Sequence, residues 1–278
     1  MQIIKTNEDI KNITDNKIIG GENITFNNSQ ISFTGRNNVL FCEEGVTLSS
    51  SNLKFNGDGC LIYLSKNSHA YMLDATLYRD SVLFFGKNNY FNGAMHIILS
   101  ERKHAFIGSG NLISFGVWLR TADPHLIYSV KTMKRINPSK SVFIGDHIWI
   151  GQGAMLLKGT QISSGSIIGA MALVSGKHIP SNESWGGNPA KKISDGIFWD
   201  NACVHAFDEE KTEKSMEYSS RKHIFKYKSN ENIPFLKIDE ALSSGSVENK
   251  IDYIKNFSED KNRFAQSGET VKKRKLFR

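Results

Sequence analysis

The chain has 278 residues, a net charge of +7 and an apolar fraction of 39%, enough for one large domain with a smaller appendage. Its three cysteines are widely spaced and form neither a metal-binding pattern nor a disulfide framework, which favours a reducing compartment. No stretch is apolar for the length of a membrane-spanning helix and the N-terminus lacks a secretory signal, so we expect a cytoplasmic protein that contacts a membrane through charge at most.

The first 116 residues consist of short alternating segments, such as Ile24-Thr-Phe26 and Leu53-Lys-Phe55, separated by clusters of Asn, Gly and Ser. This pattern predicts one strand after another, joined by tight turns. The last apolar residue of each segment recurs at intervals of seven or eight, which suggests wide and irregular coils. We therefore expect residues 15–180 to form one continuous β-solenoid.

The repeat becomes strict between residues 142 and 175, where an aliphatic side chain occurs at every sixth position. Neither a helix, with a period of 3.6, nor a strand, with a period of 2, sustains a period of six. Three such hexads complete one triangular coil of a solenoid, and each coil buries its aliphatic residues against the next. The predicted stacks place Ile144 beneath Ile162, Ile150 beneath Ile168, and Leu156 beneath Val174.

The repeat is interrupted at residues 119–141. This insertion holds Asp123, Pro124, His125 and Tyr128, followed by a basic cluster of Lys131, Lys134 and Arg135. Functional residues tend to lie on loops that a rigid scaffold positions. The insertion is therefore the first place to look for a site.

The repeat stops after Pro180, and residues 185–192 form an exit from the solenoid. We divide the chain into a solenoid domain (1–193) and a partly helical C-terminal appendage (194–278). Helices are expected near residues 208–218 and after Ser246, which is a suitable N-cap.

Much of the positive charge lies in a basic tail, residues 271–278. A basic tail can contact an anionic membrane or a glycan-synthesis complex, although such tails are commonly just solvated. Nucleic acid is not an expected partner, because the chain has no recognition helix, zinc-ligand spacing or basic groove with interleaved aromatic residues.

Residues 142–192 contain Val-Phe-Ile-Gly-Asp-His-Ile-Trp-Ile-Gly, then the hexads, then Ile-Ile-Gly-Ala and Gly-Asn-Pro-Ala-Lys. This series resembles the hexapeptide-repeat acetyltransferase family. The upstream Asp-Pro-His-Leu-Ile-Tyr, at residues 123–128, is similar to the branch that acetylates capsule and lipopolysaccharide sugars. The resemblance implies an all-β solenoid of the left-handed parallel β-helix type, an exception to the right-handed crossover rule. It also implies a homotrimer with its sites between neighbouring solenoids, acetyl-CoA as co-substrate and no metal.

The resemblance further implies that His125 is the catalytic base, since it precedes Trp149 by the family's spacing of two dozen residues. A neutral histidine can take a proton from an alcohol as it attacks a thioester, which contributes about 10²–10⁴-fold in rate. Asp123 could orient the imidazole or its loop, and a partner from elsewhere is an equal alternative. Backbone N–H groups of the turn at residues 149–152 are candidates for stabilising the oxyanion. His147 is a competing base but has the character of a turn residue.

Other residues are assigned to binding. Trp149 either lines the site or packs at a trimer interface. The basic cluster of the insertion could pair with acceptor carboxylates, and in the alternative it is simply solvated. Lys177 departs from the family's pattern, because Gly176 separates it from the Ser/Thr position. We predict acceptor contacts at Trp118, Arg120 and Tyr128, contacts to CoA at Gly151, Gly169, Ala170 and Ser175, and phosphate contacts at Lys177 and Lys191 with its neighbour Lys192.

The predicted function is direct O-acetylation of a bacterial surface-polysaccharide sugar, in capsule, polysialic acid or lipopolysaccharide. No covalent acyl-enzyme is expected, because the chain shows no nucleophile signature. Two alternatives stay open: acetylation of an amine or antibiotic on the same scaffold, and a non-catalytic scaffold in glycan synthesis.

Overall fold

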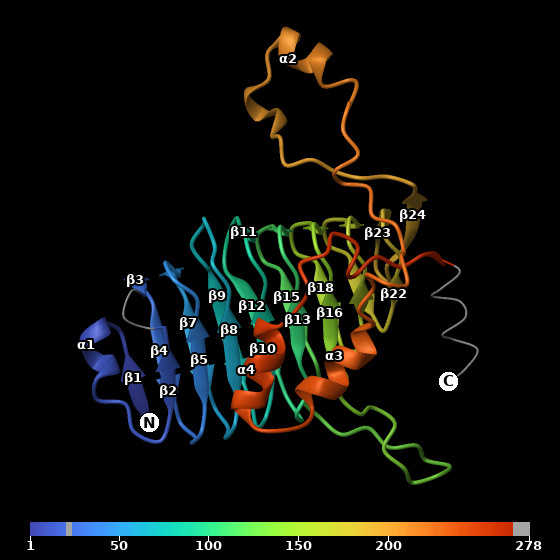
Figure 1. The fold of residues 1–278 in the computed structure, drawn as a ribbon. Coiled ribbons are helices and arrows are strands. Elements are labelled where there is room, and N and C mark those ends of the chain that lie inside the picture. Colours follow the sequence, from blue (N-terminus) through green and yellow to red (C-terminus); the bar gives the residue numbers. More distant parts are fainter. Residues whose placement is uncertain (21–23, 269–278) are drawn as a thin grey trace.

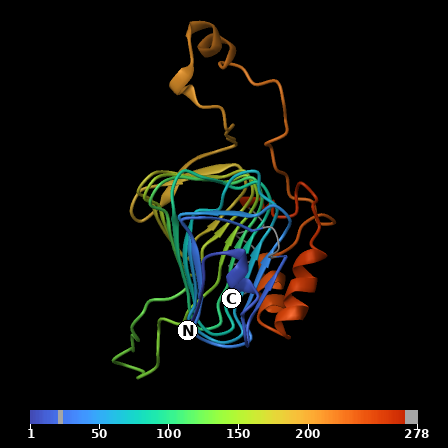
Figure 2. The same ribbon diagram turned by 90° about the vertical axis from the view of Figure 1, so that its left-hand side faces the viewer.

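A computed structural model describes residues 1–20 and 24–268; the predicted basic tail lies outside these described residues. The chain winds into a parallel β-solenoid of triangular section, a left-handed β-helix as predicted (Figures 1 and 2). Each coil contributes one strand to each of three sheets, which we call faces I, II and III. The turns between the faces form three long edges of the solenoid, the I–II, II–III and III–I edges.

Face I begins with an antiparallel strand, β1, and is otherwise parallel. Face III closes at its C-terminal end with an antiparallel strand, β24. Face I contains β1 (Gln2–Ile4), β4 (Gln30–Phe33), β7 (Asn52–Phe55), β9 (Leu73–Leu77), β12 (Met95–Leu99), β15 (Trp118–Arg120), β18 (Met155–Leu157) and β21 (Leu173–Ser175). Face II contains β2 (Lys17–Ile19), β5 (Val39–Cys42), β8 (Leu61–Leu64), β10 (Val82–Phe85), β13 (Ala105–Ile107), β16 (Val142–Ile144), β19 (Gln161–Ile162) and β22 (His178–Ile179). Face III contains β11 (Tyr90–Phe91), β14 (Leu112–Ile113), β17 (Trp149–Ile150), β20 (Ile167–Ile168), β23 (Glu183–Gly186) and β24 (Lys191–Asp195). Near the N-terminus lie α1 (Asn7–Ile10) and a small parallel pair, β3 (Thr25–Asn27) and β6 (Thr47–Ser49).

The coils have two lengths. In the N-terminal part Leu53 pairs with Ala75 and Ala75 with Ile97, so a coil takes 22 residues. In the hexad region Leu156 pairs with Val174, a step of 18 residues. The wider irregular coils expected before residue 116 are therefore confirmed. So are the three predicted stacks, because Ile144 pairs with Ile162 and Ile150 with Ile168 as well.

The solenoid interior is apolar throughout, and all six hexad aliphatics are fully buried. The wider coils fill their larger section with aromatic side chains, among them Phe33, Phe55, Tyr71 and Phe85. Twelve non-glycine residues among the described ones have positive φ, six of them Asn or Asp, as expected for tight turns between short strands.

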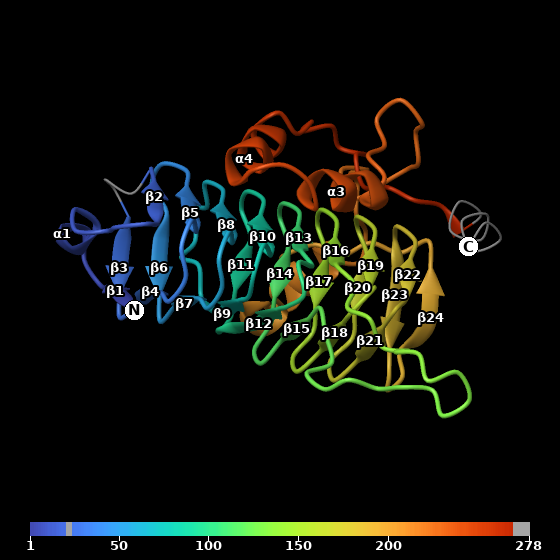
Figure 3. The ribbon, with the colours of Figure 1, turned by 90° about the horizontal axis from the view of Figure 1, so that it is seen from below.

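The C-terminal appendage folds back onto the solenoid. After β24 an arm, residues 197–232, rises from the end of face III and contains a 3₁₀ turn (Val204–Ala206) and α2 (Glu209–Lys214) (Figure 1). The chain then returns to lay α3 (Phe235–Leu242) and α4 (Val247–Lys255) on face II (Figures 2 and 3). We call residues 233–266 the C-terminal cover. The predicted helix after Ser246 is confirmed, with Ser246 as its N-cap, whereas α3 was not predicted.

The cover seals face II with a second apolar cluster. Outward side chains of face II pack against Phe235, Ile238 and Leu242 of α3, Ile251 and Ile254 of α4, and Phe264. An ion pair fastens the cover at the II–III edge, where the Arg263 guanidinium donates to both carboxylate oxygens of Asp146 at 2.8 Å. Face I has no such cover in the part of the chain that the structure describes.

Candidate active site

The inserted loop, residues 121–141, leaves the I–II edge between β15 and β16 and projects beyond the solenoid (Figures 1 and 3). It is a hairpin, in which Tyr128 bridges to Arg135 and the Ile136 N–H donates to Ile127 O at 2.9 Å. Its apolar side chains are exposed: Leu126, Ile127, Tyr128, Val130, Met133 and Ile136. An apolar hairpin held out in solvent indicates a contact surface.

The base of this loop is rigidly held. Asn137 donates to Asp123 Oδ2 at 3.1 Å and to the carbonyl of His125 at 2.8 Å, and it accepts from the Ile127 N–H at 2.9 Å. The Lys158 ammonium, one coil further on, donates to Asp123 Oδ2 at 2.5 Å. This contact is the main reason that the pKa of Asp123 is lowered. The backbone on either side of His125 is therefore fixed, although the loop tip is not packed.

A second clamp joins the loop to the preceding coil. Both Arg135 Nη atoms donate to Glu101, at 2.6 and 2.9 Å, and Ser139 Oγ donates to the same carboxylate. These donors lower the pKa of Glu101 to about 2. Arg135 is thus engaged, whereas Lys131 and Lys134 stay exposed without a side-chain partner among the described residues.

The His125 imidazole is exposed, and no hydrogen bond to it is present among the described residues of one chain. Asp123 spends its carboxylate on Lys158 and Asn137. Of the alternatives open for Asp123, the structure therefore displays the one in which it orients the loop. The imidazole is left available for a partner or a substrate from outside the chain.

Trp118 and Arg120 lie on β15, at the point where face I meets the loop. The Arg120 guanidinium lies 5.0 Å from the centre of the Trp118 ring, and His96 of the preceding coil stacks on that ring at 4.5 Å. His96 Nδ1 is 3.3 Å from Asp74 Oδ2. Sequence reasoning missed His96 and Asp74; the spacing of 22 residues from Asp74 to His96 and on to Trp118 would have placed them in one row.

Trp149 lies elsewhere. It is on β17 of face III, 40% exposed, and its ring centre is 6.3 Å from that of Trp199 in the arm. The loop edge, between faces I and II, is opposite face III in the triangular section (Figure 2). One chain therefore does not bring His125 and Trp149 together.

The residues predicted to bind CoA fall on two edges. Gly151, Gly169 and Ala170 lie on the III–I edge, whereas Ser175 and Lys177 lie on the I–II edge, and the two groups flank face I of the last coils. Lys191, on β24, is exposed, while Lys192 pairs with Asp195 at 2.6 Å.

Coil packing gives Gly151 a steric role of its own. A Cβ on Gly151 would lie 2.5 Å from Ala170 N, so the coils could not stack at this spacing with a larger residue. By contrast, a Cβ at Gly169 would meet nothing closer than 3.5 Å.

His147 has a structural environment. Its ring is sandwiched between Trp199, with ring centres 4.1 Å apart, and His223, at 3.8 Å. His147 Nε2 lies 3.0 Å from Trp199 O, and Trp199 Nε1 donates to His147 O at 3.0 Å. Burial lowers the pKa of His147 to about 4. This histidine anchors the arm to the II–III edge.

Two further searches were confined to the described residues. No group of three or more His, Cys, Asp or Glu side chains there is arranged to hold a metal ion. None of the helices in residues 1–20 and 24–268 is long and apolar enough to span a membrane.

Comparison with known proteins gave matches in sequence and in fold, although no family model matches the chain. A polysialic acid O-acetyltransferase of Neisseria meningitidis is 28% identical over 181 residues, which covers 65% of this chain and 83% of the relative. A putative lipopolysaccharide biosynthesis O-acetyltransferase of Escherichia coli K12 is 32% identical over 120 residues, 40% of this chain and 60% of that relative. The crystal structure of the polysialic acid O-acetyltransferase OatWY superimposes with a TM-score of 0.61 at 25% identity, covering 74% of this chain and 97% of that one. These likenesses confirm the resemblance predicted from residues 123–192.

Proposed function

We propose that this chain, a hexapeptide-repeat acetyltransferase of the capsule branch, transfers an acetyl group from acetyl-CoA directly to a hydroxyl of a bacterial surface-polysaccharide sugar. His125 acts as the general base. The observation that supports this most strongly is its position: an exposed, unpaired imidazole on a loop whose base is fixed by Asn137, Asp123 and Lys158. Fixed backbone with a free ring suits a group that must meet a substrate proton.

The reaction requires one base and one oxyanion donor. The His125 imidazole takes the proton of the sugar hydroxyl as its oxygen attacks the thioester carbonyl. The tetrahedral intermediate then collapses, the C–S bond breaks, and the CoA thiolate receives the proton from the imidazolium. In the predicted oxyanion turn the N–H groups of Trp149 and Gly151 already donate to the next coil, at Ser166 O and Ile168 O. The Gln152 N–H has no acceptor among the described residues, so we assign the oxyanion contact to it.

The acceptor and CoA meet on face I of the last coils in this proposal. Face II is closed by the C-terminal cover, so face I is the open surface beside the loop. Trp118 and Arg120 lie on this face, and the residues predicted to contact CoA flank it on both edges. Lys177 is half-buried on the loop side, and Lys191 is exposed at the far end of face III. Both lysines are kept as candidates for phosphate contacts.

A second copy of the chain completes the site. His125 and Trp149 lie on opposite sides of one solenoid, and the hairpin that carries His125 exposes apolar side chains away from its own body. We therefore propose a homotrimer in which each loop reaches the neighbouring solenoid. Mixing inactive His125→Ala chains with inactive Trp149→Ala chains tests this arrangement. Trimers with one restored site would regain part of the activity, and complete inactivity of every mixture would contradict a shared site.

The reaction itself is tested by release of free thiol from acetyl-CoA against a panel of capsular and lipopolysaccharide glycans, with amines as a second panel. We expect release with an acidic or neutral glycan, and a fall of about 10²–10⁴-fold in kcat for His125→Ala. His96→Ala is the matched control, since His96 is another partly exposed histidine beside Trp118. Loss of activity in His96→Ala with full activity in His125→Ala would transfer the role of base to His96 and its partner Asp74.

A further inference from the structure

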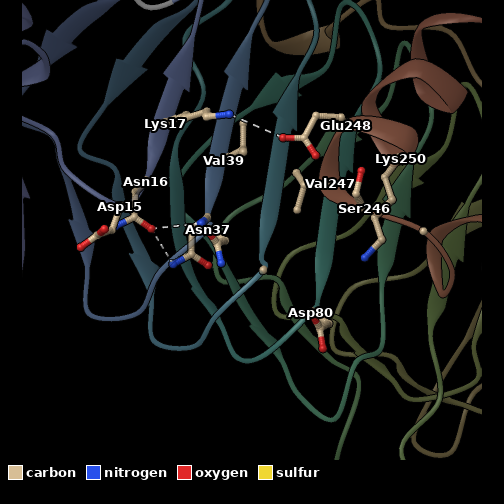
Figure 4. A pocket seen from close by; sticks show the side chains of 13 residues that line it. Asp15, Asn16, Lys17, Asn37, Val39, Asp80, Ser246, Val247, Glu248 and Lys250 are labelled. Atoms are coloured by element: carbon tan, nitrogen blue, oxygen red, sulfur yellow. Dashed lines mark hydrogen bonds and ion pairs between the residues drawn. The ribbon is translucent and has the colours of Figure 1, made fainter.

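A cavity of about 500 Å³ lies along the I–II edge of the wide N-terminal coils, where the first turn of α4 passes over successive coil turns (Figure 4). It is far from the inserted loop in sequence but lies on the same edge of the solenoid. The solenoid side is formed by the turns at residues 15–17, 37–39, 59 and 80, and the cover side by residues 245–250. A cavity of this size accommodates a small organic molecule or a sugar unit.

Lys250 points into this cavity, toward the turn that carries Asp80 (Figure 4). The residue is only 5% exposed, and its ammonium makes no ion pair or hydrogen bond with any described residue. Burial lowers the pKa of Lys250. Lysine is almost never buried this deeply without a partner, because the desolvated charge is costly.

The other charges around the cavity are already paired or lie in solvent. Lys17 forms an ion pair with Glu248 at 3.6 Å, and Asp80 forms one with Arg102 at 3.6 Å. Asp15 is exposed at the mouth. The uncompensated charge inside the cavity is therefore that of Lys250.

The amide groups of the lining divide in the same way. Asn16 Oδ1 accepts from both the backbone N–H and the side chain of Asn38, and Asn38 Oδ1 accepts from Cys60 N–H. The Asn37 side chain has no partner among the described residues and is exposed at the cavity. The cavity thus offers a buried ammonium, a free amide and, at Asp15, a free carboxylate. This set matches a ligand with one carboxylate and several hydroxyls.

We propose that the cavity is a second saccharide site that binds one acidic sugar unit, with the sugar carboxylate on Lys250 and its hydroxyls on Asn37 and Asp15. A dianionic phosphate fits less well, because Asp15, Asp80 and Glu248 all lie at the lining. The role of the site in acetylation rests on the proposed function. Coils of a parallel solenoid are spaced by about 4.8 Å, so the Asp80 turn lies about 10 Å along the axis from the inserted loop, two coils on. An acidic polymer held in the cavity would extend along the edge toward His125.

Equilibrium binding without acetyl-CoA tests the site directly. A sialic acid tetramer is titrated calorimetrically into the full-length wild type, into Lys250→Met, and into Lys237→Met as a control. Lys237 is an exposed lysine on α3 of the same cover, so its removal changes the net charge equally. We expect binding to wild type and Lys237→Met, and about tenfold or greater weakening in Lys250→Met, as for loss of a charged hydrogen bond. Equal binding by wild type and Lys250→Met would overturn the proposal.

Two further readouts separate this site from its alternatives. Inorganic phosphate that binds as tightly as the tetramer and displaces it would overturn the saccharide assignment and leave a simple anion site. Thermal unfolding of Lys250→Met should occur at the same or a higher temperature than in wild type, because a buried unpaired charge is removed. A lower unfolding temperature would show that the ammonium is needed for folding and would overturn its role as a ligand group.

The failure of this proposal differs from a failure of the proposed function. If the tetramer binds through Lys250 but no acetyl group is transferred to it, the acceptor assignment fails and the saccharide site stands. If acetylation proceeds with Lys250→Met showing an unchanged KM for long and short acceptors alike, the saccharide site fails and the catalytic proposal stands. We expect a raised KM for the tetramer with unchanged kcat, and unchanged values for a monomer.

Discussion

Faces I and II belong to the same coils, yet their outward side chains have opposite characters. Outward residues of face II are apolar and packed under the cover, for example Tyr63, Phe84 and Phe106. Those of face I are polar, aromatic or charged and partly exposed, for example Asp74, His96 and Trp118. The difference teaches that the solenoid core alone does not decide which surface is free for a ligand: the chain closes one face with its own C-terminus and leaves the other open.

The largest expected effect is on the closed face. Phe264 is fully buried and lies against Phe106, Phe235 and Phe257, with ring centres 5.5–5.7 Å apart. Phe264→Ala should lower the free energy of unfolding by about 3–5 kcal/mol, because it leaves a cavity between the cover and face II. Urea denaturation measures this. The control is Phe115→Ala, since Phe115 is 54% exposed on the III–I edge and should change stability by about 0.5 kcal/mol or less. Equal effects would mean that the cover is not packed on face II.

A smaller effect concerns the edge where face I meets the cover. His104 is fully buried; its Nδ1 accepts from Val82 N–H at 3.2 Å, and its Nε2 lies 3.1 Å from Ser243 Oγ of the cover. Burial lowers the pKa of His104 from 6.5 to about 3. Between these two values the unfolded chain binds more protons than the native one, so stability is lost as pH falls below about 6.5. Lowering the pH to 4.5 should cost about 2–3 kcal/mol at this group.

Comparison of wild type with His104→Gln isolates this contribution. His147, with its pKa of about 4, adds to the loss over much of the same range and remains in both proteins. The variant should show a shallower fall in unfolding free energy between pH 6.5 and 4.5. An identical pH dependence would argue against a buried neutral His104.

The smallest expected effect is on the open face. Trp118→Ala should change stability by about 1 kcal/mol, because the ring is only partly buried. If face I receives the acceptor, the same change should raise the KM for the sugar about three- to tenfold with little change in kcat, as for loss of one aromatic contact. Tyr90→Ala, which removes an exposed aromatic residue of face III, is the control. An unchanged KM in Trp118→Ala would place the acceptor elsewhere.

The sequence was most informative where one residue type met one structural demand. Ile144, Ile150 and Leu156 recur at six, and their stacking partners follow from that period alone. The wide coils were harder to register, because their period of 22 spreads over aromatic, Asn and Ser positions that vary. The cover had a signal that went unused: face II strands such as Leu61–Leu64 and Val82–Phe85 are apolar on both sides, which predicts that something covers them.

The candidate site was predictable by residue but not by position. His125, Asp123 and Trp118 could be named from motifs, but the role of Asp123 depends on Lys158, which reaches it across a coil boundary. Lys250 gave no signal at all, since a lysine in an amphipathic helix ordinarily faces solvent. Such contacts join segments whose separation in sequence carries no periodic mark.

The two coil lengths also set the steps by which such a chain can change its length. A deletion that keeps the strands in register must remove 22 residues from the N-terminal part or 18 from the hexad part, since any odd number would turn interior side chains outward. The inserted loop escapes this rule, because it leaves and re-enters the solenoid at one edge. Evolution could therefore exchange the reactive segment residue by residue while the barrel beneath it grows or shrinks in whole storeys.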